Sequence, residues 1–183
     1  MNEIQKLIHQ HCPNGVEYRR LNEVINYKQP TQYIVKSTEY NNEYTIPVLT
    51  AGDSFILGYT NENEGIYEAT KEKPVIIFDD FTTSFHWVDF RFKVKSSAMK
   101  MLTPKEGISF RYLYYAMKCI KYSPKEHARQ WISNYSNLPI PIPPLPIQEE
   151  IVKILDTFTE LEGELEAELK LRQKQYKYYL NKL

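Results

Sequence analysis

The chain has 183 residues, a formal net charge of zero, and a composition that is 42% hydrophobic and 25% charged. This length predicts one globular domain with an appendage, and the zero net charge argues against a purely electrostatic nucleic-acid binder. Two cysteines are too few for a disulfide framework, nothing near Met1 resembles a signal peptide, and no apolar run approaches the roughly 20 residues that cross a bilayer. We therefore expect a cytoplasmic protein with no membrane contact.

The first 138 residues alternate helical and strand-like patterns. A short amphipathic helix is expected at 3–11, and an extended entry leading into a helical turn at 15–25. Stretches rich in β-branched and aromatic residues predict strands at 45–52, 54–60, 65–70, 74–78 and 84–94. Helical spacing after a possible Ser109 cap predicts a helix at 109–122. The fold class expected is α+β, with a curved mixed or antiparallel sheet that is partly barrel-like.

No constellation for catalysis is apparent. The sequence has no phosphate-binding glycine loop, no His/Cys metal spacing and no serine elbow. Asp79 and Asp80 are an adjacent acid pair in an expected loop, and paired acids can hold Mg²⁺, but no Glu-x-Lys nearby completes a nuclease-like arrangement. A solvated or structural turn is the favoured interpretation. We expect no catalytic residue, no metal and no cofactor.

Two segments carry weak signals for DNA binding. In "DFRFKVK", Arg91, Lys93 and Lys95 would share one strand face and could follow phosphates, although a solvated sheet face has the same pattern. "HARQWISNYSN" combines Arg129 and Gln130, side chains that read base edges, with aromatic residues. The alternative is that its tryptophan anchors the last strand or helix to the core.

A proline-rich segment separates this body from a helix. Five prolines fall between positions 139 and 146, which predicts a stiff polyproline II spacer that cannot be a helix or a central strand. Pro146 suits the first turn of a following helix. We therefore expect a globular domain at 1–146 and a long helix at 147–183.

The long helix has the pattern of a coiled coil. Apolar residues recur at steps of three and four, with one insertion after Leu165, and about 36 residues extend ~54 Å. The expected seam residues are Ile151, Ile154, Phe158, Leu161, Leu165, Leu169, Tyr176, Tyr179 and Leu183. The segment 148–168 has eight acidic residues and one lysine, whereas 169–183 has five basic residues and no acid. This segregation favours an antiparallel partner helix; the alternative is a single amphipathic helix packed on its own domain.

Several segments in order resemble one family across almost the whole chain. They are "CPNGVEYRRLNEV", "LTAGDSFILGYT", "KPVIIFDDFTTSFHWVDFRFKVKSSAMKML" and, above all, "LPIPIPPLPIQEEIVKILD". The chain resembles half of the specificity subunit of type I restriction-modification enzymes, with one target-recognition domain and one long helix.

The resemblance implies a non-catalytic subunit that reads one half of a bipartite target in double-stranded DNA. Its helix would dock modification (methyltransferase) subunits, and restriction subunits would join the complex. Full subunits have two recognition domains and two antiparallel helices, so this chain is expected to be a natural half-subunit, a truncated product or a fragment. A homodimer of antiparallel helices would read an interrupted palindrome, with the ~54 Å rod spanning on the order of 15 bp.

The family's base-reading residues lie on loops of one concave face. By position, the resemblance implies base contacts from Tyr59, Thr60, Asn61, Thr82, Thr83, Ser84, His86, Arg129 and Gln130. It implies phosphate contacts from Arg91, Lys93 and Lys95. Two other functions stay open: a specificity subunit of another, fused restriction-modification type, and a coiled-coil adaptor that binds no DNA. An independent methyltransferase is disfavoured because no Asn-Pro-Pro-Tyr-like motif appears.

Overall fold

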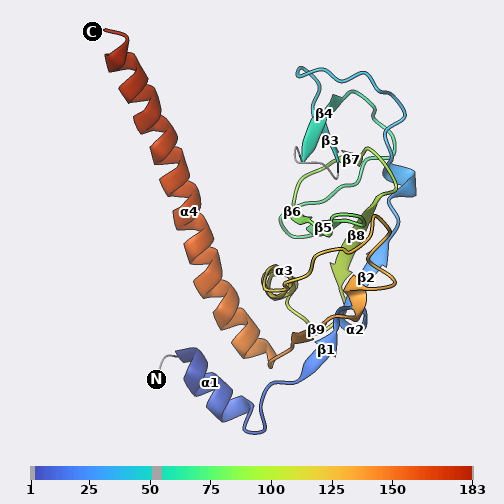
Figure 1. The fold of residues 1–183 in the computed structure, drawn as a ribbon, viewed down its shortest axis with the longest axis vertical. Coiled ribbons are helices and arrows are strands. Elements are labelled where there is room, and N and C mark those ends of the chain that lie inside the picture. Colours follow the sequence, from blue (N-terminus) through green and yellow to red (C-terminus); the bar gives the residue numbers. More distant parts are fainter. Residues whose placement is uncertain (1–2, 51–54, 183) are drawn as a thin grey trace. The chain divides into compact units, whose positions relative to one another are not determined.

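A computed structural model describes residues 3–50 and 55–182 and divides the chain into two compact units (Figure 1). One unit, here called the body, spans 17–142; the other, the helical unit, combines 1–16 with 143–183. The grouping differs from the expected division into 1–146 and 147–183, because the first helix contacts the last one instead of joining the body. The ends of two expected strands, at 51–54, lie outside the described residues.

The helical unit consists of α1 (Glu3–His11) and α4 (Leu145–Leu180). The half-buried residues Ile4, Leu7 and Ile8 fall on one face of α1 because they are three and four positions apart. Pro144 is the N-cap of α4 and Pro146 lies in its first turn, where a missing N–H costs no helical hydrogen bond. The expected long helix is confirmed, and it begins two residues before the expected start.

The proline-rich segment contains a short strand. β9 (Pro139–Pro141) pairs antiparallel with β1 (Tyr18–Arg20) in a two-stranded sheet. Because prolines cannot donate hydrogen bonds, non-proline residues next to the strands link the two segments. The N–H of Leu21 donates to Leu138 O, and the N–H of Ile142 donates to Glu17 O. The expectation of an unbroken polyproline II spacer over 139–146 is therefore wrong at its first three residues.

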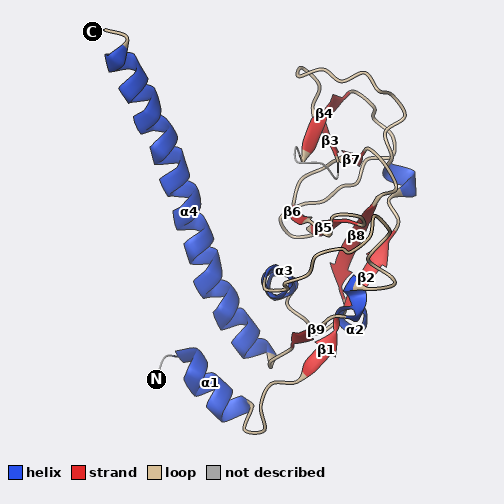
Figure 2. Cartoon of the chain, viewed as in Figure 1, coloured by secondary structure: helices blue, strands red, loops and turns tan. Residues whose placement is uncertain are grey.

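The remaining strands of the body form two further sheets (Figure 2). The larger is antiparallel in the order β2-β8-β5-β6: β2 (Ile25–Lys28), β8 (Met99–Pro104), β5 (Val75–Asp79) and β6 (Phe85–Val88). The smaller is mixed in the order β4-β3-β7: β4 (Ile56–Thr60), β3 (Ile46–Leu49) and β7 (Lys93–Val94), with β3 and β7 parallel. Short helical segments are α2 (Leu21–Val24), η1 (Thr31–Tyr33), α3 (Phe110–Lys118) and η2 (Tyr135–Asn137). The α+β class is confirmed, with several small sheets in place of one curved sheet.

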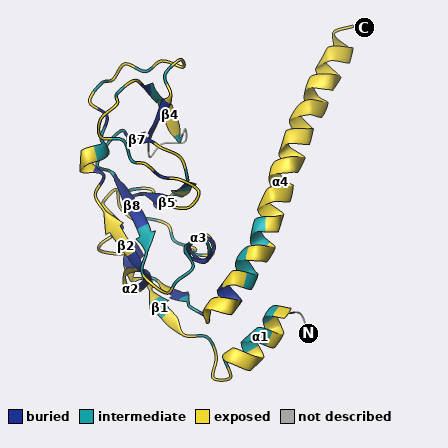
Figure 3. Ribbon diagram, turned by 180° about the vertical axis from the view of Figure 1, so that it is seen from behind, coloured by how far each residue is buried: buried dark blue, intermediate teal, exposed yellow. Residues whose placement is uncertain are grey.

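The core of the body lies on β5 and β8. Every residue of β5 is buried, as are the first four of β8 (Figure 3). Leu49, Val88 and Phe92 extend this core to the smaller sheet and join the two sheets through one apolar cluster. Burial of such side chains contributes roughly 1.5–3 kcal/mol each, so the strands that carry the candidate loops are fixed by this cluster.

Two expected strands differ from the structure, and two observed strands were not expected. The expected strand at 84–94 is divided, because the chain leaves the larger sheet after Val88 and enters the smaller one at Lys93. The stretch 65–70 forms only an isolated bridge between Tyr67 and Phe92. The central strand β8 and its neighbour β2 were not expected. The helix α3 is confirmed, and the Ser109 hydroxyl accepts a hydrogen bond from the Tyr112 N–H, as a cap requires, although α3 ends at Lys118.

Candidate nucleic-acid interface

The turn between β5 and β6 is held by the first acid of the pair. The Asp79 carboxylate accepts hydrogen bonds from the N–H of Phe81 at 2.8 Å and the hydroxyl of Thr82 at 2.7 Å. The hydroxyls of Thr82 and Ser84 are 2.8 Å apart. Thr83 has a φ of +62°, in the left-handed region that β-branched residues rarely adopt, and its side chain is buried. The structural turn expected for the acid pair is present, but both acids are buried and not solvated.

The second acid lies in a buried ion pair. Asp80 Oδ2 is 2.7 Å from Lys100 Nζ, which β8 places in the core with the residue 0% exposed. The two groups are close but poorly aligned for a hydrogen bond, so their attraction is ionic. Asp80 Oδ1 accepts from the backbone N–H of Gln130 at 3.1 Å and of Trp131 at 2.8 Å. One carboxylate thus joins β5, β8 and the loop at 126–131.

Gln130 is a structural residue of that loop. Its side-chain amide donates to the carbonyl oxygens of Ala128 and Glu126 and accepts from the hydroxyl of Tyr122 and the amide of Asn134. All four hydrogen-bonding positions are therefore used, and the residue is buried. The prediction that Gln130 presents its amide to a base is wrong for this conformation.

Trp131 anchors the loop to the core, which is the alternative left open for this segment. Its indole ring is buried and lies 5.0 Å from the ring of Phe78 on β5. Tyr135 also packs on Phe78, at 4.8 Å, and burial raises the pKa of its hydroxyl to about 12. These contacts hold Trp131 in place. They thereby fix the backbone of the preceding residue, Gln130, which is the immediate neighbour of Arg129.

Arg129 is exposed on this fixed loop. Its side chain is 50% exposed; Nη1 is 3.7 Å from Asp80 Oδ2 and donates to Ser97 O at 3.4 Å. The turn and the loop also touch through the stacked rings of Phe81 and His127, whose centroids are 4.9 Å apart. The exposed residues Thr82, Ser84 and Arg129 therefore lie on two contacting segments, and we call them the turn–Arg129 surface.

The other expected reading turn, Tyr59, Thr60 and Asn61, lies at the end of β4. Thr60 is fully buried, Tyr59 is half-buried and Asn61 is exposed. Directly after it, Glu62 Oε1 accepts from the N–H groups of Lys36 and Ser37 at 2.8 Å each. The structure thus gives Thr60 a core position, while Asn61 stays a candidate for base contact.

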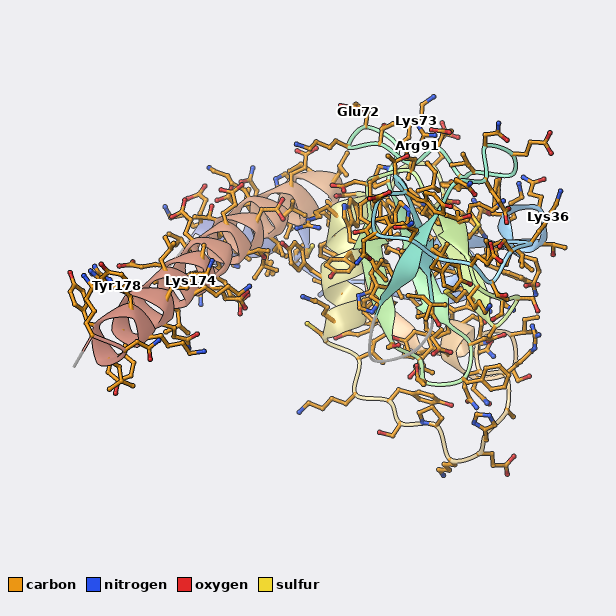
Figure 4. The ribbon with its side chains drawn as sticks, turned by 90° about the horizontal axis from the view of Figure 1, so that it is seen from above. Lys36, Glu72, Lys73, Arg91, Lys174 and Tyr178 are labelled. Carbon is orange, nitrogen blue, oxygen red and sulfur yellow. The ribbon has the colours of Figure 1, made fainter. Side chains whose placement is uncertain are left out.

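Lys93 was expected on an exposed cationic face, and this expectation is wrong. The residue is 1% exposed; its Nζ lies 2.9 Å from Glu62 Oε2 and donates to Glu64 O at 2.6 Å. Lys95 is half-buried and donates to the hydroxyl of Tyr40 at 3.1 Å. Only Arg91 of the three cations is exposed, on the outer side of the body (Figure 4). The regular alternation fails because β7 has only two residues, both buried.

The Glu62 carboxylate should make stability depend on acid pH. Burial raises its pKa, but hydrogen bonds from the Ser37 N–H, Lys93 and the Lys36 N–H outweigh burial, so the pKa lies below the ordinary value. The native state therefore favours the ionised form, and its stabilisation is present above the unfolded pKa and lost as pH falls through the native pKa.

We expect Glu62→Gln to lower the free energy of unfolding at pH 7, as measured by urea titration. In a second urea titration at about pH 3.5, the difference in free energy of unfolding between variant and wild type should be smaller. The exposed neighbour variant Glu64→Gln should show no such narrowing. A Glu62→Gln difference that is the same at both pH values contradicts the ionic role of this carboxylate.

His86 lies on β6 beside the start of β4. Its ring stacks on Phe55 with centroids 4.0 Å apart, and burial lowers the pKa of the imidazole. The residue as a whole is exposed. This neutral, ring-stacked histidine stays a candidate for base contact.

The apolar seam of α4 is exposed along the helical unit. Eight of the nine expected seam residues are described, and Leu183 lies outside the described residues. All eight are half-buried or exposed, with Phe158 at 64% and Leu165 at 66%. A shallow groove runs along Phe158, Leu161, Leu165 and Leu169. An exposed apolar stripe of this length indicates a surface for a partner helix.

No group of His, Cys, Asp and Glu suited to a metal ion occurs in the described ranges 3–50 and 55–182. Within the same ranges, no helix combines the length and the apolar character needed to cross a membrane.

Comparison with known proteins identifies the family. The sequence profile described as "Type I restriction modification DNA specificity domain" matches residues 13–171, which is most of the chain. The chain belongs to this family. The specificity subunit of the type I restriction enzyme EcoR124I/EcoR124II from Escherichia coli is 55% identical over 179 residues, covering 92% of this chain and 44% of that subunit.

Two further relatives agree. A putative type I restriction enzyme specificity subunit of Haemophilus influenzae is 35% identical over 182 residues, covering 92% of this chain and 46% of that protein. The crystal structure of a type I restriction-modification S subunit from M. genitalium matches with a TM-score of 0.64 over 88% of this chain and 44% of that chain, at 16% identity, which supports the fold. This specificity-domain chain spans about half the length of the curated relatives it matches.

The sequence did not indicate two features of this specificity domain. Lys100 occurs in an apolar run beside two methionines, and that setting was the available signal for a buried lysine. Leu171 and Tyr178 are exposed on α4, two turns apart and off the seam; Tyr178 is labelled in Figure 4. The heptad pattern draws attention to the seam alone, so these two residues went unnoticed.

Proposed function

We propose that this chain is a non-catalytic DNA-reading subunit that recognises one half of a split target in double-stranded DNA. Membership of the specificity-domain family is the observation that carries the proposal. The turn–Arg129 surface supports it, because hydroxyls and an arginine on rigid segments are suited to hydrogen bonding in the major groove.

In the same proposal, α4 joins two copies as antiparallel helices and docks modification (methyltransferase) subunits, with restriction subunits joining the complex. The exposed seam supports a helical partner, and the acidic 148–168 segment would lie beside the basic 169–183 segment of the second copy. Two-fold symmetry then requires the same half-site on both sides of an unread spacer. The cytoplasm, where host DNA lies, is the proposed location.

Selection from randomised duplexes tests DNA reading. Because the net charge is zero, the chain alone should bind DNA weakly, so the selection uses the full chain together with modification subunits. We expect enrichment of a short split motif. Modification subunits without the chain are the control and should enrich nothing. Equal recovery of all sequences with the chain present contradicts DNA reading and favours a coiled-coil adaptor.

A further inference from the structure

A buried ion pair lies directly beneath an exposed arginine of the body. Asp80 and Lys100 are 1% and 0% exposed, and their charged atoms are 2.7 Å apart. Arg129, half-exposed, approaches the same Asp80 Oδ2 at 3.7 Å. A buried ion pair is weak evidence for stability, since a well-packed apolar pair is often as stable. Its position beneath Arg129 points instead to a role in holding that side chain.

The charges in this cluster leave Arg129 available for a ligand. Asp80 already has a buried cation at contact distance and two backbone N–H donors from Gln130 and Trp131. The longer approach of Arg129 is therefore not needed to neutralise the carboxylate. Lys100 is thus the close cationic partner of Asp80, and the half-exposed guanidinium of Arg129 presents its own charge to solvent.

The contacts of the guanidinium also leave one edge open. Both of its contacts, to Asp80 Oδ2 and to Ser97 O, use Nη1. Nε and Nη2 make no hydrogen bond to other residues in the described part of the chain. These two N–H groups form a planar pair of parallel donors, which matches two acceptors on one rigid ligand.

The loop backbone around Arg129 is fixed from two sides. Gln130 N–H also donates to the main-chain oxygen of Asp80 at 2.7 Å, and the Gln130 side chain closes the loop through four hydrogen bonds. Asp80 N–H donates to Ala98 O at 2.9 Å, beside β8. A donor pair on such a support loses little conformational freedom when it binds.

We propose that Arg129 reads the O6 and N7 acceptors of a guanine in the major groove through Nε and Nη2, and that Asp80, with Lys100, is its positioning residue. This inference rests on the proposed function and names the base at one position of the half-site. Guanine is the base whose major-groove edge offers two acceptors side by side, and arginine is its commonest partner. Thr82 and Ser84 lie on the adjoining segment and serve the neighbouring base pair.

The test starts from the half-site selected with the wild-type complex. Each guanine of that half-site is replaced in turn by 7-deazaguanine, which lacks N7 and keeps O6. We expect one replacement to weaken wild-type binding roughly 10-fold or more. Arg129→Lys, which keeps the charge and loses the fork, should lower the preference for guanine at that position 10- to 100-fold and show little further loss with 7-deazaguanine. Arg91→Ala is the control, because Arg91 is an exposed arginine outside the turn–Arg129 surface. This variant should weaken binding to all duplexes alike.

The positioning role has its own variants, Asp80→Asn and the pair Asp80→Asn with Lys100→Met, both checked for folding by circular dichroism. In both variants an uncharged amide replaces the Asp80 carboxylate, so the ionic attraction on Nη1 of Arg129 is lost. The preference for guanine at that position should fall at least 5-fold, while binding to scrambled duplex stays the same. Wild-type preference in a folded pair variant overturns the role of Asp80. If Arg129→Lys weakens binding to every duplex equally, Arg129 contacts a phosphate and the guanine assignment is overturned. The assignment is also overturned if no 7-deazaguanine replacement weakens binding of the wild-type complex. If selection yields no half-site, the proposed DNA reading itself fails.

Discussion

Replacing Leu161 and Leu165 together by glutamate is expected to separate the proposed α4-paired dimer into monomers. Both leucines are exposed on the seam within the helical unit and would be buried by a partner helix. Each buried leucine contributes roughly 1.5–3 kcal/mol, and a symmetric dimer loses both on each helix. The dissociation constant should therefore rise on the order of a thousandfold or more, which sedimentation equilibrium at micromolar concentration measures as the mass of one chain.

Gly163→Glu with Ala167→Glu is the matched control for this variant. It adds the same two charges to the same turns of α4, at positions off the seam, and a Cβ at Gly163 meets no atom within 4 Å. The control should keep the mass of two chains. If both double variants have the same mass, or if the wild-type chain is already a monomer, the seam does not join two copies.

Replacing Lys100 alone by methionine is expected to lower the free energy of unfolding of the body by about 3 kcal/mol or more. Methionine keeps the apolar stem but leaves the Asp80 carboxylate buried without its cation. The two backbone N–H donors and Arg129 remain, so the loss should fall near the low end of the range for a broken buried pair. Urea denaturation followed by tryptophan fluorescence measures it, because Trp131 lies beside the site.

Two further variants test whether the unpaired buried charge causes that loss of stability. Adding Asp80→Asn to Lys100→Met should recover much of the stability, because the neutral pair leaves no buried charge. Lys125→Met, the same substitution at an exposed loop position, should change stability by less than about 0.5 kcal/mol. A single Lys100→Met variant as stable as Lys125→Met contradicts the buried ion pair.

The elements that the sequence predicts well are those in which one strong local pattern determines the structure. Helix α4 follows from proline in its first turn and apolar residues that recur at helical spacing along most of its length. Helix α3 follows from its Ser109 cap and helical spacing. The strand β5 follows from the run "PVIIF", because a continuous β-branched stretch fits a strand buried on both faces.

The errors come from charged residues placed inside by partners distant in sequence. Lys93 is neutralised by Glu62, and Lys100 by Asp80, so neither lysine marks a solvent-exposed face. β8 was not expected because a methionine- and lysine-containing strand has weak local preference, and pairing with β5 and β2 overrides it.

The candidate site shows the same division between local and long-range information. Arg129 was proposed from its local sequence and the turn at Thr82–Ser84 from its position in the family resemblance; in the structure Arg129, Thr82 and Ser84 are exposed and Thr83 is buried. That they lie on contacting segments depends on Asp80 receiving hydrogen bonds from Gln130 and Trp131, fifty residues away in the chain, which no local pattern records. Gln130 has the right side chain for base reading, but four internal hydrogen bonds use it completely.

The most direct test of the central claim is a methylation map of host DNA with and without this gene. Two identical reading bodies joined by antiparallel α4 helices predict one class of methylated site that disappears with the gene, in which the same short sequence occurs twice, inverted, across a fixed unread gap. A site with two unlike halves, or a methylation pattern that does not change when the gene is removed, would contradict it.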